Sequence, residues 1–392
     1  MGKQVFFLFA ILAFVAANDT GCKNNYNLGS YGKCVPLGCC EANAQDSDES
    51  LCEGGGSTET CCFRDNVCGA NNCLNVVGTW VSRYNYHGSY GEIDQGFSKL
   101  AAKGVNRVYF NIWADGNLYA QSNTASSNGV IMQDDRLDMA VSIAKSYGME
   151  VYAWFEYGTQ ASYGQLNGFS SSAAQKGWLL CGDAGCSDYF AGGNYAYLNL
   201  INPEVVSFLA GISADLAKNY PQLDGIQFDD HFALPNEFYQ VGGLSQSQKF
   251  GYTRDAMVAI RDAVKGARGS AQVSYAPSTL DFSINNHNVD WSQYLIDGVV
   301  QELAPQYYFT SYSSFKSTLD KDLSRVPRHQ NGLVAGCLEA VLILQSAMWI
   351  KCCPTPLRRT FGAFLFGSLM MSSVTRVMTH PRSHLANKMT EQ

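Results

Sequence analysis

Two adjacent carboxylates, Asp229 and Asp230, end the apolar run DGIQFDD at residues 224–230, and His231 follows them. Acidic residues after a strand are common in turns, so the pair could simply end a strand. Paired carboxyl groups can also cleave a glycosidic bond, since one protonates the leaving oxygen while the other attacks the sugar or activates water. The elements that hold these residues decide between the two hypotheses.

Strand-like and helix-like segments alternate from Gly78 onward, which predicts a parallel sheet. A doubly wound sheet and a barrel both fit, but this many strands over about 260 residues favour a (β/α)8 TIM-barrel-like fold. The expected strands are 78–84, 105–113, 149–157, 223–230, 271–278, 299–309 and 331–336. The expected helices are 92–104, 134–148, 202–220, 245–269, 291–298 and 312–326.

Polar or aromatic residues stand at the carboxyl ends of these strands, where a barrel builds its site. They are Arg83, Tyr84, Trp113, Asp115, Glu156, Asp229, Asp230, Ser278 and Tyr308. Successive strand residues face opposite sides, so Asp229 shares a face with Gln227 and Asp230 shares the other with Phe228. Asp229 is therefore expected to be catalytic, and Asp230 either caps a loop or supplies a second carboxyl at the rim.

The partner carboxyl has more than one candidate. Glu156 is the nearest by topology because strands three and four are neighbours, although it could also bind sugar or lie at the surface. Asp115 is a second candidate, but Asp-Gly after a strand often forms only a turn. Glu302 opens strand six, so we place it at the opposite, stabilising end. The expected substrate contacts are Tyr84, Trp113, Asp115, Trp154, His231, Gln306 and Tyr308; both tryptophans also fit a packed core.

Residues 1–17 have the pattern of a secretory signal peptide: an early lysine, an apolar stretch, and small residues before a cut after Ala17. The stretch is too short for stable membrane insertion. We therefore expect a secreted protein, extracellular or in the lumen of an endomembrane compartment. The net charge of -7 offers no basic stripe, so nucleic acid is not an expected partner. No phosphate loop, nucleophile elbow or spaced histidine pair is present, so neither a cofactor nor a metal is expected.

Residues 18–77 form a separate cysteine-rich module, because this stretch is too poor in apolar residues to bury a core. In an oxidising compartment its cysteines should form disulfides; zinc is the alternative, but no histidine precedes His87. The module contains Cys22, Cys34, Cys39, Cys40, Cys52, Cys61, Cys62, Cys68 and Cys73. Further along, Cys181 and Cys186 are expected to close a small loop within an insertion at 158–202.

The segments GKCVPLGCC and LCEGGGSTETCCF resemble the small cysteine-rich module that precedes peptidoglycan-degrading domains in some fungi and protists. The resemblance covers about forty residues of the chain. It implies adhesion to cell-wall glycan, and a plain spacer is the alternative.

Several blocks in order resemble the glycosyl hydrolase-like 10 family, a set of TIM-barrel glycosidases, over 78–336. They are GTWVSRY, ADGNLYAQS, EVYAWFEY, LNLINPEVVSFL, LDGIQFDDHF, VSYAPS and DWSQYLIDGVVQELAPQYY. The resemblance implies a glycoside hydrolase acting on a polysaccharide, with bacterial members acting on peptidoglycan glycan. Glu156 stands where the family usually has asparagine. The strand-four pattern is also similar to that of the alpha-amylase family, whose nucleophile corresponds to Asp229, although Gln227 replaces an arginine.

Residues 337–392 depart from the family, because no clear strand or helix pattern follows Gly336. We expect an incomplete or divergent ending there, or a misread one. The run 333–350 could span a membrane, but Glu339 lies within it. Two other functions therefore stay open: a glycan-binding barrel disabled by loss of its last strands, and a glycosidase for another polymer such as an α-glucan or a host glycan.

Overall fold

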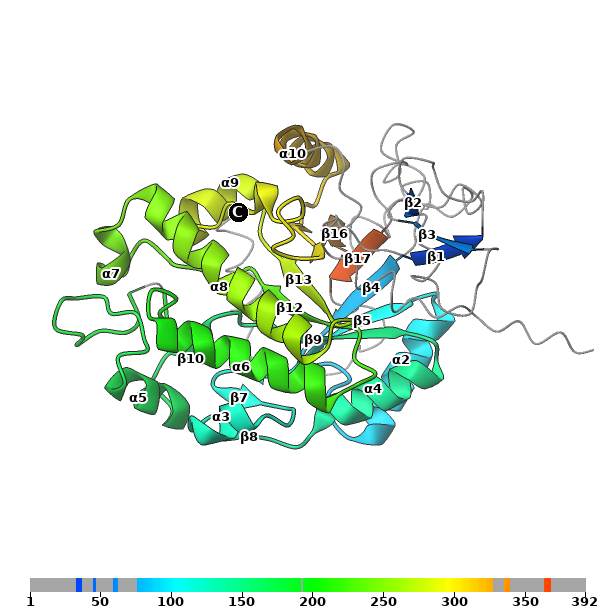
Figure 1. Cartoon of the computed structure of the whole chain (residues 1–392), viewed down its shortest axis with the longest axis horizontal. Coiled ribbons are helices and arrows are strands. Elements are labelled where there is room, and N and C mark those ends of the chain that lie inside the picture. Colours follow the sequence, from blue (N-terminus) through cyan, green and yellow to red (C-terminus); the bar gives the residue numbers. More distant parts are fainter. Residues whose placement is uncertain are drawn as a thin grey trace, which may run out of the picture.

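The computed structural model describes residues 33–36, 45–46, 59–62, 76–191, 193–326, 335–338 and 363–367. Within these residues the largest sheet has nine strands in the order β14-β13-β12-β9-β5-β4-β17-β16-β15, and its pairs are parallel (Figure 1). The strands are β4 (Val76–Val81), β5 (Arg107–Asn111), β9 (Glu150–Phe155), β12 (Gly225–Asp229), β13 (Gln272–Ala276), β14 (Glu302–Leu303), β15 (Gln306–Tyr307), β16 (Ala335–Leu338) and β17 (Ala363–Gly367).

The two ends of this sheet belong to one stretch of chain. Only Ala304 and Pro305 separate β14 from β15, so the sheet returns to its starting point. A parallel bridge between Ser278 and Gln306 extends the contact between β13 and β15. Because β14 and β15 share one position, the sheet has the eight positions of a (β/α)8 TIM-barrel-like fold, as the sequence predicts.

The eighth position is filled by β17, which lies in the part of the chain where the sequence pattern indicated no strand. β17 pairs with β16 on one side and with β4 on the other. Its sequence, AFLFG, is a short apolar run without alternation, a pattern common among the strands of parallel sheets. Of the endings left open after Gly336, the structure therefore favours the divergent one over the incomplete one, because the segment supplies a strand.

Long helices follow the strands and cover the outside of the barrel (Figure 1). They are α2 (Tyr90–Ala102), α4 (Arg136–Ser146), α6 (Pro203–Asn219), α8 (Gln246–Ala267) and α10 (Tyr312–Arg325). Their starts carry the expected caps: the Ser245 side chain accepts the Gln248 N–H, and Asn202 caps α6 ahead of Pro203. The helix expected at 291–298 is only a 3₁₀ turn, Trp291–Gln293. No described helix is long and apolar enough to cross a membrane.

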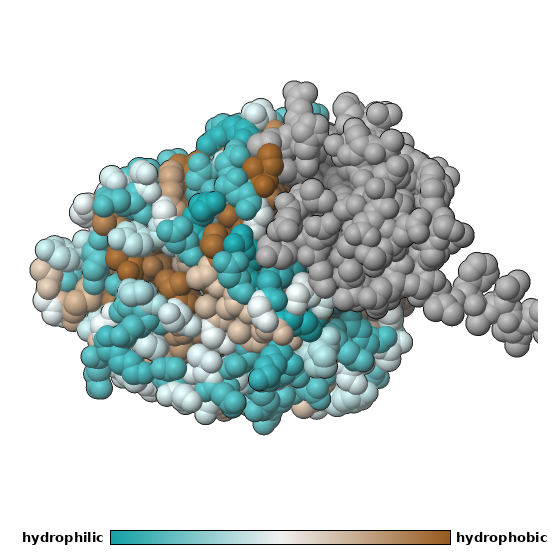
Figure 2. All heavy atoms as spheres, viewed as in Figure 1, coloured by the Kyte–Doolittle hydropathy of each residue, from teal (hydrophilic) through white to brown (hydrophobic). Residues whose placement is uncertain are grey.

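The helices bury apolar side chains against the outer face of the sheet. α6 and α8 lie side by side (Figure 1), and their buried residues include Phe208, Ile212 and Ile260. Figure 2 shows brown, apolar surface in the region between these two helices, bordered by teal, polar surface. The outward side chains of the strands, such as Phe110 and Phe228, belong to the same core. Apolar packing between the helices and the outer face of the sheet thus stabilises the barrel. The side chains that point into the barrel can therefore be polar.

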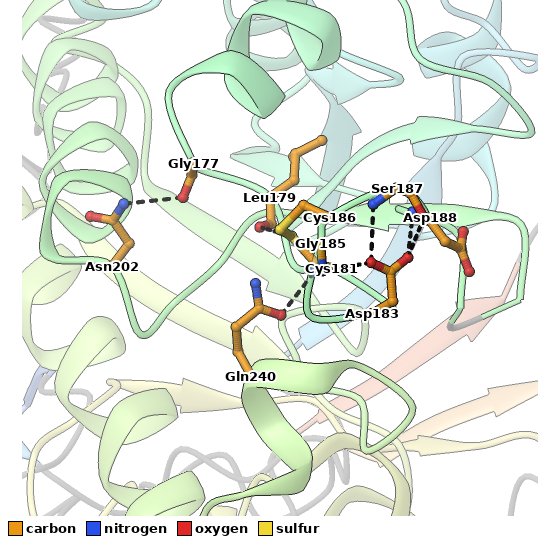
Figure 3. The surroundings of a disulfide bond; sticks show 10 residues. All are labelled: Gly177, Leu179, Cys181, Asp183, Gly185, Cys186, Ser187, Asp188, Asn202 and Gln240. Atoms are coloured by element: carbon orange, nitrogen blue, oxygen red, sulfur yellow. Dashed lines mark hydrogen bonds between the residues drawn. A yellow bond between two sulfur atoms is a disulfide. The ribbon is translucent and has the colours of Figure 1, made fainter.

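The insertion after β9 folds onto the mouth of the barrel. It contains β10 (Gln160–Tyr163), α5 (Gly168–Gln175) and β11 (Tyr195–Tyr197), with β10 and β11 antiparallel. The predicted disulfide between Cys181 and Cys186 is confirmed, with Cα atoms 4.9 Å apart. The Cys181 N–H donates to the Gln240 side chain of α7 (Tyr239–Gly242), which ties this loop to the one after β12 (Figure 3).

Smaller elements complete the described chain. They are β6 (Trp113–Ala114), β7 (Asn117–Leu118), α3 (Asn123–Ser127), β8 (Ile131–Met132) and α9 (Leu280–Phe282), which runs into a π-helical turn, Ser283–His287. In the cysteine-rich module, β1 (Lys33–Pro36), β3 (Glu59–Cys62) and β2 (Gln45–Asp46) form an antiparallel sheet, and Cys61 is disulfide-bonded. Cys34 and Cys62 also lie on strands of this sheet. The predicted signal peptide, most of 337–392 and the remaining module cysteines lie outside the described residues; these cysteines are Cys22, Cys39, Cys40, Cys52, Cys68 and Cys73.

Candidate active site

Glu156 and Asp229 continue two neighbouring strands at the mouth of the barrel. β9 and β12 pair in register, with Trp154 beside Gln227 and Phe155 beside Phe228. The next residues along are Glu156 and Asp229. Because side chains alternate along a strand, both carboxylates face the same way as Trp154 and Gln227, which is into the barrel. The structure thus brings together the two acids that the sequence favoured.

A side-chain amide holds each of these carboxylates. The Asn111 Nδ2 donates to Glu156 Oε2 at 2.6 Å, and the Gln306 Nε2 donates to Asp229 Oδ1. Asp229 Oδ1 also accepts the Asp230 N–H at 2.9 Å, and the Asp229 side chain is only 2 % exposed. Such hydrogen bonds fix the orientation of each carboxyl group. The mouth therefore presents two oriented acids, one deep and one half-buried.

Asp230 faces away from Asp229, as the strand alternation predicts. The Ser278 Oγ donates to Asp230 Oδ2 at 2.8 Å. His231 Nδ1 accepts from the Gln160 amide at 2.9 Å, so the ring proton is on Nε2, which lies 3.9 Å from Asp230 Oδ1. A catalytic role for Asp230 stays a prediction, and its contacts show that it joins the loops after β12 and β13.

Asp115 lies in a tight turn, which agrees with the interpretation of Asp-Gly as a turn more than with a catalytic carboxyl. Its backbone is left-handed, with φ of 51°, and its carboxylate pairs with Arg83 at 2.7 Å. The Arg83 guanidinium lies over the rings of Tyr84 and Tyr157, at 4.9 and 5.4 Å from their centres. Tyr84 is 67 % exposed, so this cluster offers an open aromatic face at the rim. Asp115 serves to hold Arg83 in that cluster.

The aromatic residues expected to contact substrate differ in burial: some lie in the core, and one lies at the mouth of the barrel. Trp113 is 0 % exposed, and its indole N–H donates to the Gln160 carbonyl at 3.0 Å. It cannot stack on a sugar, so its expected substrate contact is corrected to core packing. Trp154 is also nearly buried, inside the barrel beside Trp80 at 6.3 Å between ring centres. Tyr308 is half-buried and meets Trp80 edge-on, so it stays a candidate for substrate contact.

The opposite end of the barrel interior is an ion-pair network. Arg107 is buried and pairs with both Glu150 and Glu302. Glu302 also accepts from the Tyr109 hydroxyl at 2.8 Å and from Ser274 Oγ at 2.8 Å. Glu302 is therefore satisfied at the stabilising end, where the sequence placed it.

Two residues that the sequence analysis missed support the site. Asn111 orients Glu156, and His87 Nε2 donates to the Asn111 carbonyl at 2.5 Å. His87 Nδ1 accepts from Arg136, and burial lowers the pKa of His87 to about 4, so the ring is neutral. The alternation of the 105–113 strand could have placed Asn111 inside the barrel. No sequence signal connects His87 to it.

A parallel β/α barrel with two oriented carboxylates at the carboxyl ends of adjacent strands has the architecture of a glycoside hydrolase. The glycosyl hydrolase-like 10 family matches residues 80–332, so the chain belongs to that family. None of the curated proteins compared with the chain matches it. Among the described residues, no group of three histidine, cysteine, aspartate or glutamate side chains could hold a metal ion.

Solved structures similar to the chain include three glycosidases. An alpha-L-fucosidase isoenzyme 2 from Paenibacillus thiaminolyticus is 13 % identical over 75 % of this chain and 46 % of its own, with a TM-score of 0.49. An inactive exo beta-N-acetylglucosaminidase from Vibrio harveyi is 10 % identical over 83 % and 53 %, with a TM-score of 0.49. The beta-amylase catalytic domain from Paenibacillus polymyxa is 11 % identical over 74 % and 91 %, also at 0.49. The chain thus spans about half the length of the first two.

Proposed function

We propose that this protein is a secreted glycoside hydrolase that cleaves a polysaccharide, bacterial cell-wall glycan, with Asp229 and Glu156 as its catalytic carboxyl groups. The observation that carries the proposal is that these two acids extend neighbouring strands and that each is oriented by an amide. Family membership supports the reaction class. The signal-like start and the resemblance of the cysteine-rich module support secretion and a cell-wall substrate.

The placement on adjacent strands favours a retaining mechanism. Neighbouring strands lie about 4.8 Å apart, and retaining glycosidases hold their carboxyl groups about 5–5.5 Å apart. Asp229, the deeper acid with two N–H donors, is suited to attack the anomeric carbon as the leaving oxygen takes a proton from Glu156. Glu156 then removes a proton from the water that displaces Asp229 and releases the sugar.

A reducing-end assay on denuded peptidoglycan, chitin and starch tests both the reaction and the polymer. We expect product from peptidoglycan, with the anomeric configuration of the first product retained when followed by NMR. Asp229→Asn and Glu156→Gln should abolish it, whereas Asp255→Asn, a matched change at an exposed position of α8, should not. If the protein bound peptidoglycan but released no product from any of the three polymers, the proposed hydrolase would be wrong and a glycan-binding barrel would be favoured. Product from starch alone would indicate an α-glucan glycosidase.

A further inference from the structure

We propose that a contact between two loops at the mouth of the barrel sets the distance between the two catalytic carboxyl groups. Gly158, Thr159 and Gln160, which follow β9, meet His231, which follows β12. We call these four residues the inter-loop contact. The inference rests on the proposed function, and it makes Thr159 and Gln160 positioning residues for that reaction.

Glu156 needs such support because the paired strands end before it. The ladder between β9 and β12 ends with Phe155 beside Phe228, and the ladder between β5 and β9 ends with Asn111 beside Trp154. Glu156 therefore lies beyond the last backbone pair on both sides of β9. A side-chain amide orients its carboxylate, but the position of its backbone relative to β12 depends on the next contact along the chain.

Hydrogen bonds provide that next contact. The Thr159 N–H donates to the His231 carbonyl at 3.0 Å, and the Thr159 Oγ1 donates to the same oxygen at 2.8 Å. The Gln160 Nε2 donates to His231 Nδ1 at 2.9 Å. Thr159 and Gln160 are 0 % and 1 % exposed, so these bonds form where water does not compete for them. The inter-loop contact is therefore a buried hydrogen-bonded joint between the two loops.

The backbones of the two loops also approach each other closely. Gly158 has a left-handed backbone with φ of 52°, which glycine adopts without strain. A Cβ atom at this position would lie 2.3 Å from both the His231 carbonyl carbon and the Phe232 nitrogen. Any larger residue would therefore have to push the loops apart.

A tight turn joins each side of the inter-loop contact to one of the acids. The Gly158 N–H donates to the Phe155 carbonyl at 2.9 Å, and this turn contains Glu156. The Phe232 N–H donates to the Asp229 carbonyl at 3.0 Å, and this turn begins at Asp229. Because both turns are closed by a hydrogen bond, a shift of one loop against the other should move the carboxyl groups apart or together.

The distance between the carboxyl groups decides what they can do. Retaining glycosidases hold them about 5–5.5 Å apart, and inverting ones hold them about 6.5–9.5 Å apart. A misplacement of about 1 Å at a reacting group can lower the rate about a hundredfold. We therefore expect the inter-loop contact to act on turnover and not on affinity for the polymer.

The same two loops are joined again farther along the chain. The Tyr239 N–H donates to the Cys181 carbonyl at 2.7 Å, and the Cys181 N–H donates to the Gln240 side chain at 2.8 Å (Figure 3). A variant that loses one bond of the inter-loop contact keeps these two. Such a variant should therefore still fold.

Initial rates on denuded peptidoglycan test the Thr159 hydroxyl. Thr159→Val keeps the shape of the side chain and should lower kcat about tenfold, with KM within about twofold. Thr159→Ser keeps the hydroxyl and should retain most of kcat. Thr253→Val is the matched control, because Thr253 is also buried and its hydroxyl donates to the Asn288 carbonyl at 3.0 Å, on helix α8. Its kcat should stay within about twofold of the unsubstituted chain.

Crystal structures of Thr159→Val and Gly158→Ala measure the positioning role without any activity. The distance between Glu156 Cδ and Asp229 Cγ should change by about 0.5 Å or more, the tolerance within which catalytic groups must be held. Gly158→Ala should show the larger change and should lower kcat about a hundredfold.

An unchanged distance in both variants would overturn the positioning role. An equal loss of kcat in Thr159→Val and Thr253→Val would also overturn it, since the loss would then follow from removing any buried hydroxyl. If the unsubstituted chain cleaves peptidoglycan and Thr159→Val cleaves it equally fast, the positioning role is wrong and the hydrolase stands. If the unsubstituted chain cleaves no polymer, the hydrolase is wrong, and the distance in the crystals alone decides the positioning role.

Discussion

The two ends of the barrel interior both hold pairs of carboxylates, but by different means. At the amino ends of the strands, Glu150 and Glu302 pair with the buried guanidinium of Arg107. At the carboxyl ends, amide groups of Asn111 and Gln306 hold Glu156 and Asp229. A guanidinium cancels the charge of its partner, whereas an amide orients a carboxylate and leaves its charge in place. Charge compensation therefore serves stability at one end, and orientation of the carboxylates by amides suits chemistry at the other.

The first prediction separates the two ends by activity. Asp229→Asn should lower turnover on the cleaved polymer by about a thousandfold or more, because a catalytic carboxylate is lost while the amide contacts can persist. Glu302→Gln, a change of the same kind at the other end, should leave turnover within about a few-fold. Initial rates on peptidoglycan measure both. Near-normal turnover in Asp229→Asn would remove Asp229 from the mechanism.

The second prediction tests the stabilising end. Arg107→Met should lower the free energy of unfolding by about 3–5 kcal/mol, because Glu302 would then be buried without its cation. Adding Glu302→Gln should restore part of that loss, since the neutral amide needs no counter-ion. Denaturant unfolding monitored by tryptophan fluorescence gives both values. If the double variant were as unstable as the single one, the ion pair would not be the source of the stability.

The third prediction concerns pH at the residue behind Asn111. Burial lowers the pKa of His87 from 6.5 to about 4. Between about pH 6.5 and pH 4, His87 is protonated in the unfolded chain but stays neutral in the folded chain. His87 should therefore cost stability progressively as pH falls from about 6.5 towards about 4, by at most about 3 kcal/mol. Unfolding free energies across this range should fall less steeply in His87→Gln, which keeps a donor for the Asn111 carbonyl. Parallel pH profiles in the two chains would contradict a neutral, buried His87.

The smallest effect is expected from the group that orients Asp229. Gln306→Leu should lower turnover by about ten- to a hundredfold, because one hydrogen bond to a charged group is worth about 1.5–3 kcal/mol. Asp229 keeps the Asp230 N–H as a donor, so the loss should be smaller than in Asp229→Asn. Comparing kcat and KM in the two variants measures it. An unchanged kcat with a raised KM would instead make Gln306 a substrate contact, as the sequence analysis expected.

The sequence predicted the barrel and the placement of its acids because both follow from local periodicity. The alternation in DGIQFDD predicted that Asp229 and Asp230 face opposite sides of the strand, and the contacts of both residues agree. The amide partners could not be found this way, because Asn111 and Gln306 lie on other strands. Which residues of two strands lie side by side depends on how the strands pair, and the sequence of one strand does not give that pairing. The splitting of strand six at Pro305 has a local cause, because proline has no N–H to donate to a ladder.

The predictions that failed concern apolar residues whose packing partners lie far away in the sequence. Trp113 is the last residue of a predicted strand, just where a sugar platform would lie, yet its ring packs against Phe155 and Phe169. The β17 segment was missed because it is short and has neither strand alternation nor a recognisable turn before it. In both cases the deciding information is which distant segments pack together, and single-sequence periodicity does not carry it.

The pairing of β17 with β4 has a consequence for how the protein is made. Val76 lies beside Ala363, so the first barrel strand leaves the ribosome long before its neighbour is synthesised. Until then one edge of the nascent sheet has no strand beside it, and exposed edges recruit other chains. A transcript that stopped before residue 363 would still encode Glu156 and Asp229, yet its product would be recognised by chaperones and proteases as an open sheet. Quality control, rather than the catalytic groups, would then set how much intact enzyme accumulates.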